Sequence, residues 1–210
     1  MSPEFIRNAN LSQIILIKPD VFSDPRGFFL ETYHADKYST AGIDKPFVQD
    51  NHSHSRRNTL RGLHYQLKHP QAKLVSVITG EIFDVAVDIR KGSPTFGTWT
   101  GAILSEQNKH QIFVPGGFAH GFCVLSETAD VVYKCTDLYE PGDDYGILWS
   151  DPSIGIDWHV KAPTLSDKDS RNPLLEELSG EQLPQCINPD IILTPAGHYI
   201  HAQSVYLNHT

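Results

Sequence analysis

Short hydrophobic runs alternate with short polar or turn-forming segments along most of the chain. The runs are rich in β-branched and aromatic residues, which favour strands over helices. They predict strands over residues 14–17, 28–33, 73–79, 81–89, 111–114, 121–125 and 130–136. Segments rich in Pro, Gly and Asp separate the runs, and many short strands with close turns are typical of a β-sandwich or a closed barrel. Short helices are expected only over residues 34–41 and 173–178.

The segment EIFDVAVDIR, residues 81–90, shows the two-residue period of a strand most clearly. One face holds Phe83, Val85, Val87 and Ile89, and the other holds Asp84, Ala86 and Asp88. The first face is expected to pack into a core. The second carries two carboxylates and faces either water or a polar cavity, and the pattern leaves both alternatives open.

The hydrophobic pattern weakens after about residue 178. At about 150 residues per domain, a chain of this length corresponds to about 1.4 domains. We therefore expect one domain over residues 1–178 and a C-terminal extension over residues 179–210. The extension contains scattered Ile, Tyr and Val residues, which favour one or two appended strands over partial disorder.

The chain carries 17 basic and 25 acidic residues, a formal net charge of −8. This balance argues against a nucleic-acid partner or an anionic membrane surface, because both need a positive field. No apolar run approaches the ~18 residues of a membrane helix, and the first residues lack the apolar centre of a signal peptide. The three cysteines show no C-x-x-C spacing, which argues against a disulfide framework or a zinc ribbon. We therefore expect a cytoplasmic protein with reduced thiols.

The sequence is rich in histidine, with 11 residues. Imidazole suits proton transfer near neutral pH, so these residues are the first candidates for catalysis. No P-loop, nucleophile elbow or dinucleotide-binding motif is present. His52 and His54 form an H-x-H pair that could bind a metal, with His120 as a third ligand. Alternatively, the alternation of this strand points both histidines to the surface and gives the cavity face to Gln49, Asn51, Ser53 and Ser55. No carboxylate follows the pair closely, so the surface placement is the expected one.

Two further histidines and one tyrosine are candidates for a single site. His64 lies in a strand-like run, where strict alternation puts it on the opposite face from Arg61. Both side chains reach one cavity only if Gly62 marks a bulge or a twist in the strand. His120 follows a glycine-rich turn that would let the backbone approach a ligand closely. For His64 and Tyr133, a packed core residue is the alternative to a catalytic one.

Six strings occur in order along the chain: DPRGFFLETY (24–33), QDNHSHS with LRGLHYQ (49–66), FDVAVDIRKGSPTFGTW (83–99), PGGFAHGF (115–122), YKCTDLY (133–139) and LSDKD (165–169). Together they resemble the dTDP-4-dehydrorhamnose 3,5-epimerase family of sugar-nucleotide epimerases. The resemblance covers residues 12–175 and implies a double-stranded β-helix jelly roll of the cupin type, with short peripheral helices. It also implies a homodimer and catalysis without a metal or another cofactor.

The reaction implied by the resemblance is inversion of carbons 3 and 5 in a 4-keto-6-deoxyhexose linked to a nucleoside diphosphate. The carbonyl at carbon 4 acidifies the protons on its two neighbours. Inversion then needs a base on one face of the sugar ring and a proton donor on the other. It also needs hydrogen bonds or cations at the enolate oxygen that forms between the two steps.

The resemblance also assigns roles to residues. His64 is the base, Asp169 is the carboxylate that orients it, and Tyr133 is the proton donor. Lys73 and Arg61 would polarise the 4-keto oxygen or bind phosphate.

The remaining positions carried over from the family concern the substrate. Nucleotide-binding positions fall on Arg26, Glu31, Gln49, Asn51, Tyr139, Asp144 and Lys168. Position 144 is often Glu in relatives, so Asp144 is a mild departure. His120 matches a substrate-pocket position, and the alternation of residues 81–90 suggests that Asp84 orients it.

Three alternatives to the double epimerase stay open at this point. A single-position epimerase for another deoxysugar would keep the same base and acid. A metal-dependent cupin enzyme would use His52, His54 and His120. A non-catalytic sugar-binding jelly roll would need no base and acid together, so the combination of His64, Asp169 and Tyr133 argues against it.

Overall fold

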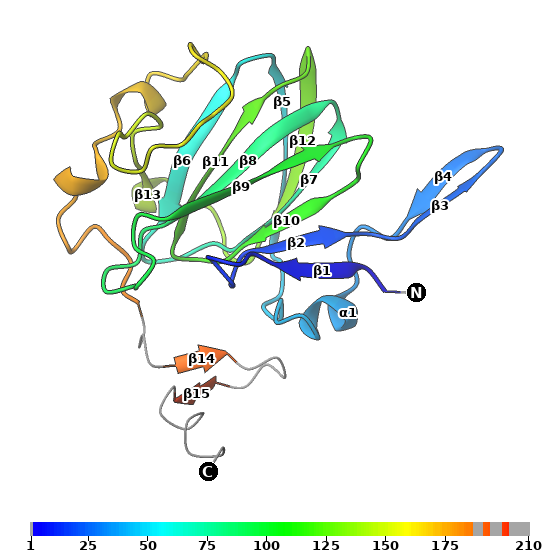
Figure 1. Ribbon diagram of the computed structural model, residues 1–210, viewed down its shortest axis with the longest axis horizontal. Coiled ribbons are helices and arrows are strands. Elements are labelled where there is room, and N and C mark those ends of the chain that lie inside the picture. Colours follow the sequence, from blue (N-terminus) through cyan, green and yellow to red (C-terminus); the bar gives the residue numbers. More distant parts are fainter. Residues whose placement is uncertain (1, 187–190, 194–198, 202–210) are drawn as a thin grey trace.

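The computed structural model describes residues 2–186, 191–193 and 199–201. Two antiparallel sheets face each other in the part of the chain that it describes (Figure 1). The first sheet holds, in spatial order, β1 (Glu4–Arg7), β2 (Ile15–Lys18), β10 (Gln111–Val114), β7 (Lys73–Thr79), β12 (Thr128–Cys135) and β5 (Gln49–Arg56). The second sheet holds β13 (Asp144–Gly146), β6 (Leu60–Gln66), β11 (Phe118–Val124), β8 (Glu81–Asp88) and β9 (Trp99–Ser105).

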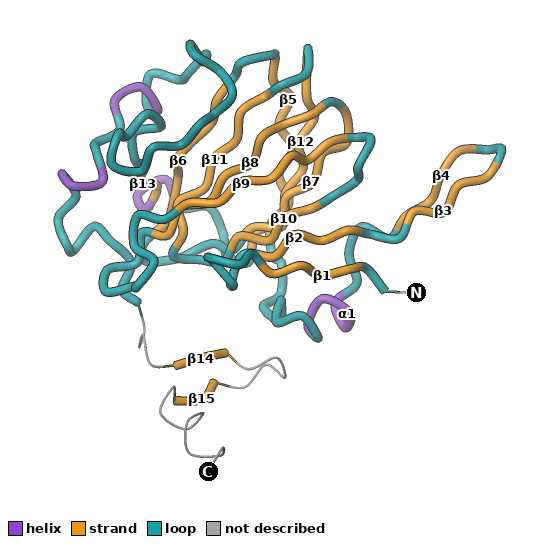
Figure 2. The backbone as a smooth tube through the Cα atoms, viewed as in Figure 1, coloured by secondary structure: helices purple, strands orange, loops and turns teal. Residues whose placement is uncertain are grey.

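The path of the chain confirms the predicted all-β jelly roll. From β5 to β13 successive strands alternate between the two sheets, and the β8–β9 pair is the one exception. This alternation is the path of a double-stranded β-helix. Among the described residues, helical structure is confined to short peripheral pieces, as Figure 2 shows. They are α1 (Ala35–Ser39), η1 (Pro141–Asp143), η2 (Asp169–Arg171) and η3 (Leu175–Glu177).

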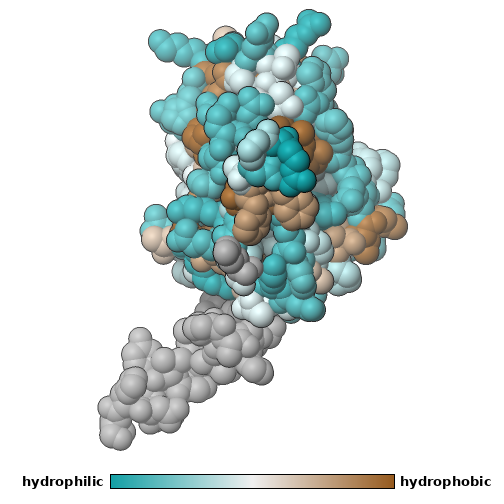
Figure 3. All heavy atoms as spheres, turned by 90° about the vertical axis from the view of Figure 1, so that its right-hand side faces the viewer, coloured by the Kyte–Doolittle hydropathy of each residue, from teal (hydrophilic) through white to brown (hydrophobic). Residues whose placement is uncertain are grey.

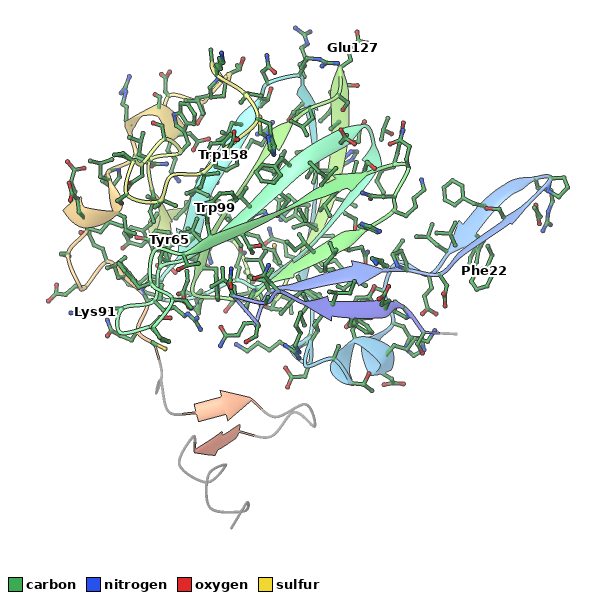
Figure 4. The ribbon with its side chains drawn as sticks, viewed as in Figure 1. Phe22, Tyr65, Lys91, Trp99, Glu127 and Trp158 are labelled. Atoms are coloured by element: carbon green, nitrogen blue, oxygen red, sulfur yellow. The ribbon has the colours of Figure 1, made fainter. Side chains whose placement is uncertain are left out.

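Three apolar clusters hold the two sheets and their coverings together. The first lies between the sheets and joins β7, β10 and β12 to β8, β9 and β11. The second covers the outer face of the five-stranded sheet, where Trp158 packs over it in the segment that follows β13 (Figure 4). The third covers the outer face of β2, β7 and β10, where Tyr38 of α1 is buried. Both sheets are therefore covered on two sides along part of their area.

This double coverage shows which way the two faces of β8, the strand with the clearest two-residue period, are turned. Phe83, Val85 and Val87 of β8 pack in the outer cluster, whereas Ala86 packs between the sheets. Asp84 lies on the same face as Ala86, and its side chain is fully buried. The water-facing alternative is therefore wrong for this strand. Asp84 reaches the cavity only through His120, which it contacts and which lines the cavity.

Most predicted strands are present, with shifted ends. The strand predicted over residues 28–33 ends early, because β4 covers Gly27–Leu30. The strand predicted over residues 121–125 begins earlier, because β11 starts at Phe118 directly after the glycine turn. The predicted helices shrink to α1 and to the single turn η3.

A two-stranded hairpin projects from the body of the molecule. It consists of β3 (Val21–Asp24) and β4, and Figure 1 shows it extending away from both sheets. Its exposed hydrophobic residues are Val21, Phe22, Phe28 and Phe29. Figure 4 places Phe22 on this hairpin, away from the sheets, and Figure 3 shows hydrophobic side chains gathered on this side of the molecule.

The segment after residue 178 keeps contact with the second sheet. Leu183 is buried in the outer cluster, and Tyr65 donates a hydrogen bond to the carbonyl of Gln182 at 2.8 Å. Further on, β14 (Ile191–Leu193) pairs with β15 (Tyr199–His201), which matches the expected appended strands. The other residues after 186 lie outside the described residues, and the domain boundary after residue 178 stays a prediction.

Within these described ranges, none of the helices has the length and hydrophobicity that crossing a membrane requires.

Candidate active site

A cavity of about 420 Å³ lies between the two sheets and takes side chains from both of them. An adjoining cavity of about 270 Å³ shares four of its lining residues, which are His64, Lys73, Tyr133 and Asp144. Together they have the size and the mixed polar and apolar lining of a small-molecule site.

His64 and Asp169 form the central pair of the first cavity. His64 Nε2 lies 2.6 Å from Asp169 Oδ1, and the Asp169 side chain is almost fully buried. Burial raises the pKa of Asp169, but hydrogen bonds from His64, Ser166 and the backbone of Gly62 outweigh it and hold that pKa below its usual value. The carboxylate is therefore charged near neutral pH. Because Nε2 donates to it, Nδ1 of His64 is left free to accept a proton.

The strand that carries His64 has a bulge at Gly62, one of the two irregularities that would let Arg61 and His64 reach one cavity. His64 pairs with His120 and Arg61 pairs with Phe122, so two residues of β6 lie opposite one residue of β11. Gly62 sits in this bulge with a φ of +128°. A Cβ at this position would lie 2.6 Å from the Cα of Gly121, so the close approach of the two strands requires glycine. The bulge lets Arg61 and His64 line the same cavity.

Tyr133 lies on the other sheet from His64. It belongs to β12, pairs with Asn51 of β5, and lines both cavities. Burial raises the pKa of Tyr133, so the phenol keeps its proton near neutral pH. A group that accepts a proton and a group that can donate one therefore lie on facing walls of one cavity.

Two cationic side chains complete this part of the site. Lys73, at the start of β7, is half-buried and lines both cavities. Burial lowers the pKa of its ammonium, while the nearby Cys135, Asp144 and Asp84 act in the opposite direction. Arg61 is anchored by a hydrogen bond from its Nε to Ser55 Oγ at 3.0 Å.

His120 and Asp84 form a second buried pair on the wall that carries His64. His120 Nε2 lies 2.9 Å from both carboxylate oxygens of Asp84. The contact expected from the alternation of residues 81–90 is therefore present.

Polar groups expected to bind the nucleotide line the adjoining cavity and the part of the first cavity next to Asp144. Tyr139 donates from its hydroxyl to Asp144 at 3.0 Å, and Lys168 also donates to Asp144. The hydrogen bond to Asp144 raises the pKa of Tyr139. Gln49 donates to Asn51 at 3.0 Å, and both line this cavity.

Two predicted binding residues lie outside both cavities. Arg26 is at the tip of the projecting hairpin, where it pairs with Asp24 at 2.5 Å. Glu31 follows β4 and pairs with Lys37 at 2.7 Å. Neither residue lines the cavity that holds His64.

The metal alternative built on three histidines is wrong. Alternation along β5 turns His52 and His54 to the outer surface, where both contact Asp130 at 2.8–3.2 Å. His120 points into the cavity instead, so these three side chains cannot bind one ion. Over the ranges that the structure describes, no other group of three His, Cys, Asp or Glu side chains has a metal-binding arrangement.

The lining of the cavity also includes residues that sequence analysis did not single out, among them Thr59, Phe122 and Thr164. Phe122 lies two residues after His120 on the same strand, so alternation could have placed it there. Thr59 and Thr164 meet through an isolated bridge between distant segments, for which the sequence carries no local signal.

Removing a proton on one side of a bound molecule and delivering one on the other is the chemistry of an isomerase that inverts a carbon centre. Comparison with known proteins agrees with this class. Residues 8–177 match the family described as dTDP-4-dehydrorhamnose 3,5-epimerase. The chain is 56% identical over 160 residues to the dTDP-4-dehydrorhamnose 3,5-epimerase of Neisseria gonorrhoeae, a match that covers 76% of this chain and 49% of that protein. It is 54% identical over 161 residues to the enzyme of that name from Shigella flexneri, covering 76% and 89%.

A solved structure is similar along most of its length. The crystal structure of dTDP-6-deoxy-D-glucose-3,5-epimerase from Legionella pneumophila in complex with dTDP-4-keto-L-rhamnose has a TM-score of 0.86 and 48% identity. The match covers 89% of this chain and 100% of that one. The chain belongs to the dTDP-4-dehydrorhamnose 3,5-epimerase family, which confirms the isomerase predicted from its sequence.

Proposed function

We propose that this protein inverts carbons 3 and 5 of a dTDP-linked 4-keto-6-deoxyhexose by proton transfer through an enolate. One observation carries the proposal: His64 and Tyr133 line the same cavity from facing sheets. A sugar ring between them would present one face to a base and the other to an acid.

In the first step, Nδ1 of His64 takes the proton from the carbon next to the carbonyl. The electron pair of that C–H bond moves to the 4-keto oxygen and leaves an enolate. Asp169 stabilises the imidazolium that forms, and it fixes the tautomer in which Nδ1 is free.

Lys73 and Arg61 stabilise the enolate oxygen. A half-buried ammonium in the cavity wall is an effective partner for this charge, because the surrounding protein screens the interaction less than water does. Donors placed in advance also avoid reorganisation at the moment of reaction.

In the second step, Tyr133 protonates the carbon from the opposite face and the configuration inverts. The tyrosinate recovers a proton and the imidazolium loses one before the second carbon reacts. The raised pKa of Tyr133 supports this role, since the phenol must be protonated when the enolate forms. No metal or other cofactor is needed for these steps.

The substrate is oriented from the mouth of the cavity. Gln49, Asn51, Tyr139 and Lys168 would hold the nucleoside diphosphate, and His120 would contact the sugar. Asp144 keeps Lys168 and Tyr139 in place between the two cavities. The expected cytoplasmic location belongs to this proposal, as does the absence of nucleic-acid or membrane partners.

A homodimer would explain the position of the projecting hairpin. Arg26 and Glu31 were expected to bind substrate, yet they lie on or beside a hairpin that exposes Phe22, Phe28 and Phe29. Packing the hairpin against a second copy would bury these side chains and bring Arg26 to the partner's cavity. Light scattering should give twice the chain mass of 23.5 kDa, and a monomer at micromolar concentration would contradict this part.

The proposed reaction is tested by incubating the protein with the dTDP-linked 4-keto-6-deoxyglucose in deuterium oxide and following it by NMR. We expect deuterium at both carbons 3 and 5, together with the doubly inverted product. Exchange at one carbon alone would indicate the single-position epimerase. An absence of exchange at both carbons would refute the proposal.

A further inference from the structure

One hydroxyl in the cavity has no role in the steps above. Ser53 lies in the middle of β5, and it lines the same cavity as His64 and Tyr133. Its Oγ is shielded from solvent and has no hydrogen-bond partner among the described residues. Buried polar atoms are nearly always paired, because leaving one unpaired costs its hydration. The unpaired hydroxyl of Ser53 lies beside the reacting groups, so a bound substrate is the natural source of its hydrogen-bond partner.

The neighbours of Ser53 on the same face of β5 are paired. Asn51 on one side donates to Cys135 Sγ at 3.6 Å. Ser55 on the other side accepts from Arg61 Nε at 3.0 Å. Poor packing of the whole strand therefore does not explain the unpaired hydroxyl.

The strand register explains why the protein itself supplies no partner. Ser53 lies opposite Val131, a fully buried apolar residue that shares its face. On its other side, β5 is the edge of its sheet in the described part of the chain. The pairing across the strands therefore gives the hydroxyl no hydrogen-bond partner directly opposite it.

The same register places Ser53 next to the proposed acid. Asn51 lies opposite Tyr133, so Ser53 is the diagonal neighbour of Tyr133 across the two strands. Diagonal neighbours on one face of a sheet are separated by roughly 7–8 Å, about the width of a sugar ring. A ring that is in position to be protonated by Tyr133 would therefore also be within reach of Ser53.

We propose that Ser53 donates a hydrogen bond to an oxygen of the sugar and holds the ring against Tyr133. This inference rests on the proposed epimerase function. Ser53 lines the cavity that contains Arg61 and His120 and is absent from the lining of the adjoining cavity of Gln49 and Tyr139. Its contact is therefore with the sugar and not with the nucleotide. Donating to the sugar breaks no existing hydrogen bond of the hydroxyl.

The placement of the ring affects which face of the enolate receives the proton. When the reacting carbon lies close to Tyr133, protonation inverts it. When the ring moves away from that wall, the imidazolium of His64 returns a proton to the original face. In deuterium oxide the second outcome appears as exchange without inversion, so loss of Ser53 raises the ratio of exchange to inversion.

The variant Ser53→Ala removes only the hydroxyl. We expect kcat/KM to fall about tenfold, which is the usual effect of losing one neutral hydrogen bond to a ligand. The ratio of exchange to inversion rises, and the affinity for dTDP, measured by calorimetry, stays within about twofold of the wild type. The midpoint of thermal unfolding stays unchanged or rises, because the hydroxyl has no partner in the free protein.

The matched control is His52→Ala, on the outer face of the same strand, which keeps wild-type kinetics. Wild-type kcat/KM and an unchanged ratio in Ser53→Ala would overturn the inference. An equal loss of dTDP affinity would also overturn it, since the hydroxyl would then serve the nucleotide or the fold. A wild-type protein without exchange at either carbon would instead refute the proposed function, and the inference with it.

Discussion

The substitution Asp169→Asn removes one charge from the central pair while keeping the shape of the side chain. Oδ1 of Asp169 lies 2.6 Å from His64 Nε2, and the Asp169 side chain is only 5% exposed. A hydrogen bond to a charged group contributes about 1.5–3 kcal/mol. Losing this support for the imidazolium alone lowers kcat about 10- to 150-fold.

The amide has a second effect that makes the loss larger. Its NH₂ group can donate to Nε2, which moves the ring proton to Nδ1, the atom that must receive the substrate proton. In serine proteases the same change of tautomer lowers kcat about 10,000-fold. We therefore expect a fall of about 100- to 10,000-fold in Asp169→Asn, measured by NMR as the rate of product formation.

The control for this variant is Asp167→Asn, two residues earlier in the same loop. Its carboxylate is 99% exposed, so the substitution should leave kcat unchanged. Thermal unfolding of both variants checks that the fold is kept. A kcat of Asp169→Asn within threefold of the wild type would refute the reasoning, because His64 would then work without its charged partner.

Three further predictions concern Lys73, Asp143 and the segment after residue 178. Lys73→Met should lower kcat about 100- to 1,000-fold by removing a cation from the enolate oxygen, whereas Lys134→Met, on the exposed face of β12, should not. Asp143→Ala should cost about 1–3 kcal/mol of unfolding free energy at pH 7 in urea titrations, because the carboxylate accepts three backbone N–H groups of residues 67–69. Burial raises the pKa of Asp143, but these hydrogen bonds bring it below its usual value. The contribution of Asp143 to the free energy of unfolding is therefore full above the pKa of the unfolded state, about 3.9, and it disappears as the pH falls through the lower pKa of the folded state. A difference in unfolding free energy between wild type and variant that stays constant from pH 7 to pH 2 would contradict this prediction. A chain ending at residue 186 should keep the stability of the full chain, whereas one ending at residue 178 should lose about 2 kcal/mol or more because it lacks the buried Leu183.

The sequence predicted those strands whose hydrophobic pattern is strong in its own right. Strand β7 and strand β8 were found with nearly correct ends, because they carry continuous or alternating apolar residues. Strand β5 is different, because its sequence QDNHSHSR contains no hydrophobic residue. It is a strand because it pairs with β12 along eight positions and turns its odd-numbered residues to the cavity. Such a strand is set by tertiary contacts, which a local pattern does not contain.

In the candidate site, too, some features could be predicted from the local sequence pattern and others could not. Counting alternate residues suggested the contact between Asp84 and His120, and it showed that Arg61 and His64 need a bulge or a twist at Gly62 to share a cavity; the contact and a bulge are both present. The position of Arg26 could not be obtained this way, because a string match says which residue corresponds to a family position but not where the folded chain places it. The roles of His64 and Tyr133 came from resemblance, and the facing sheets supply the physical reason for them.

The pairing of His64 and Tyr133 across the cavity is the central claim, and one comparison in deuterium oxide tests it. His64→Ala should lose exchange at carbons 3 and 5 together, because no base remains to remove the protons. Tyr133→Phe should keep measurable exchange while inversion falls much further, because His64 can still remove a proton and return a deuteron to the same face. If His64→Ala exchanges at the wild-type rate, or if Tyr133→Phe inverts as fast as it exchanges, the two residues do not work as a base and an acid on opposite faces of the sugar.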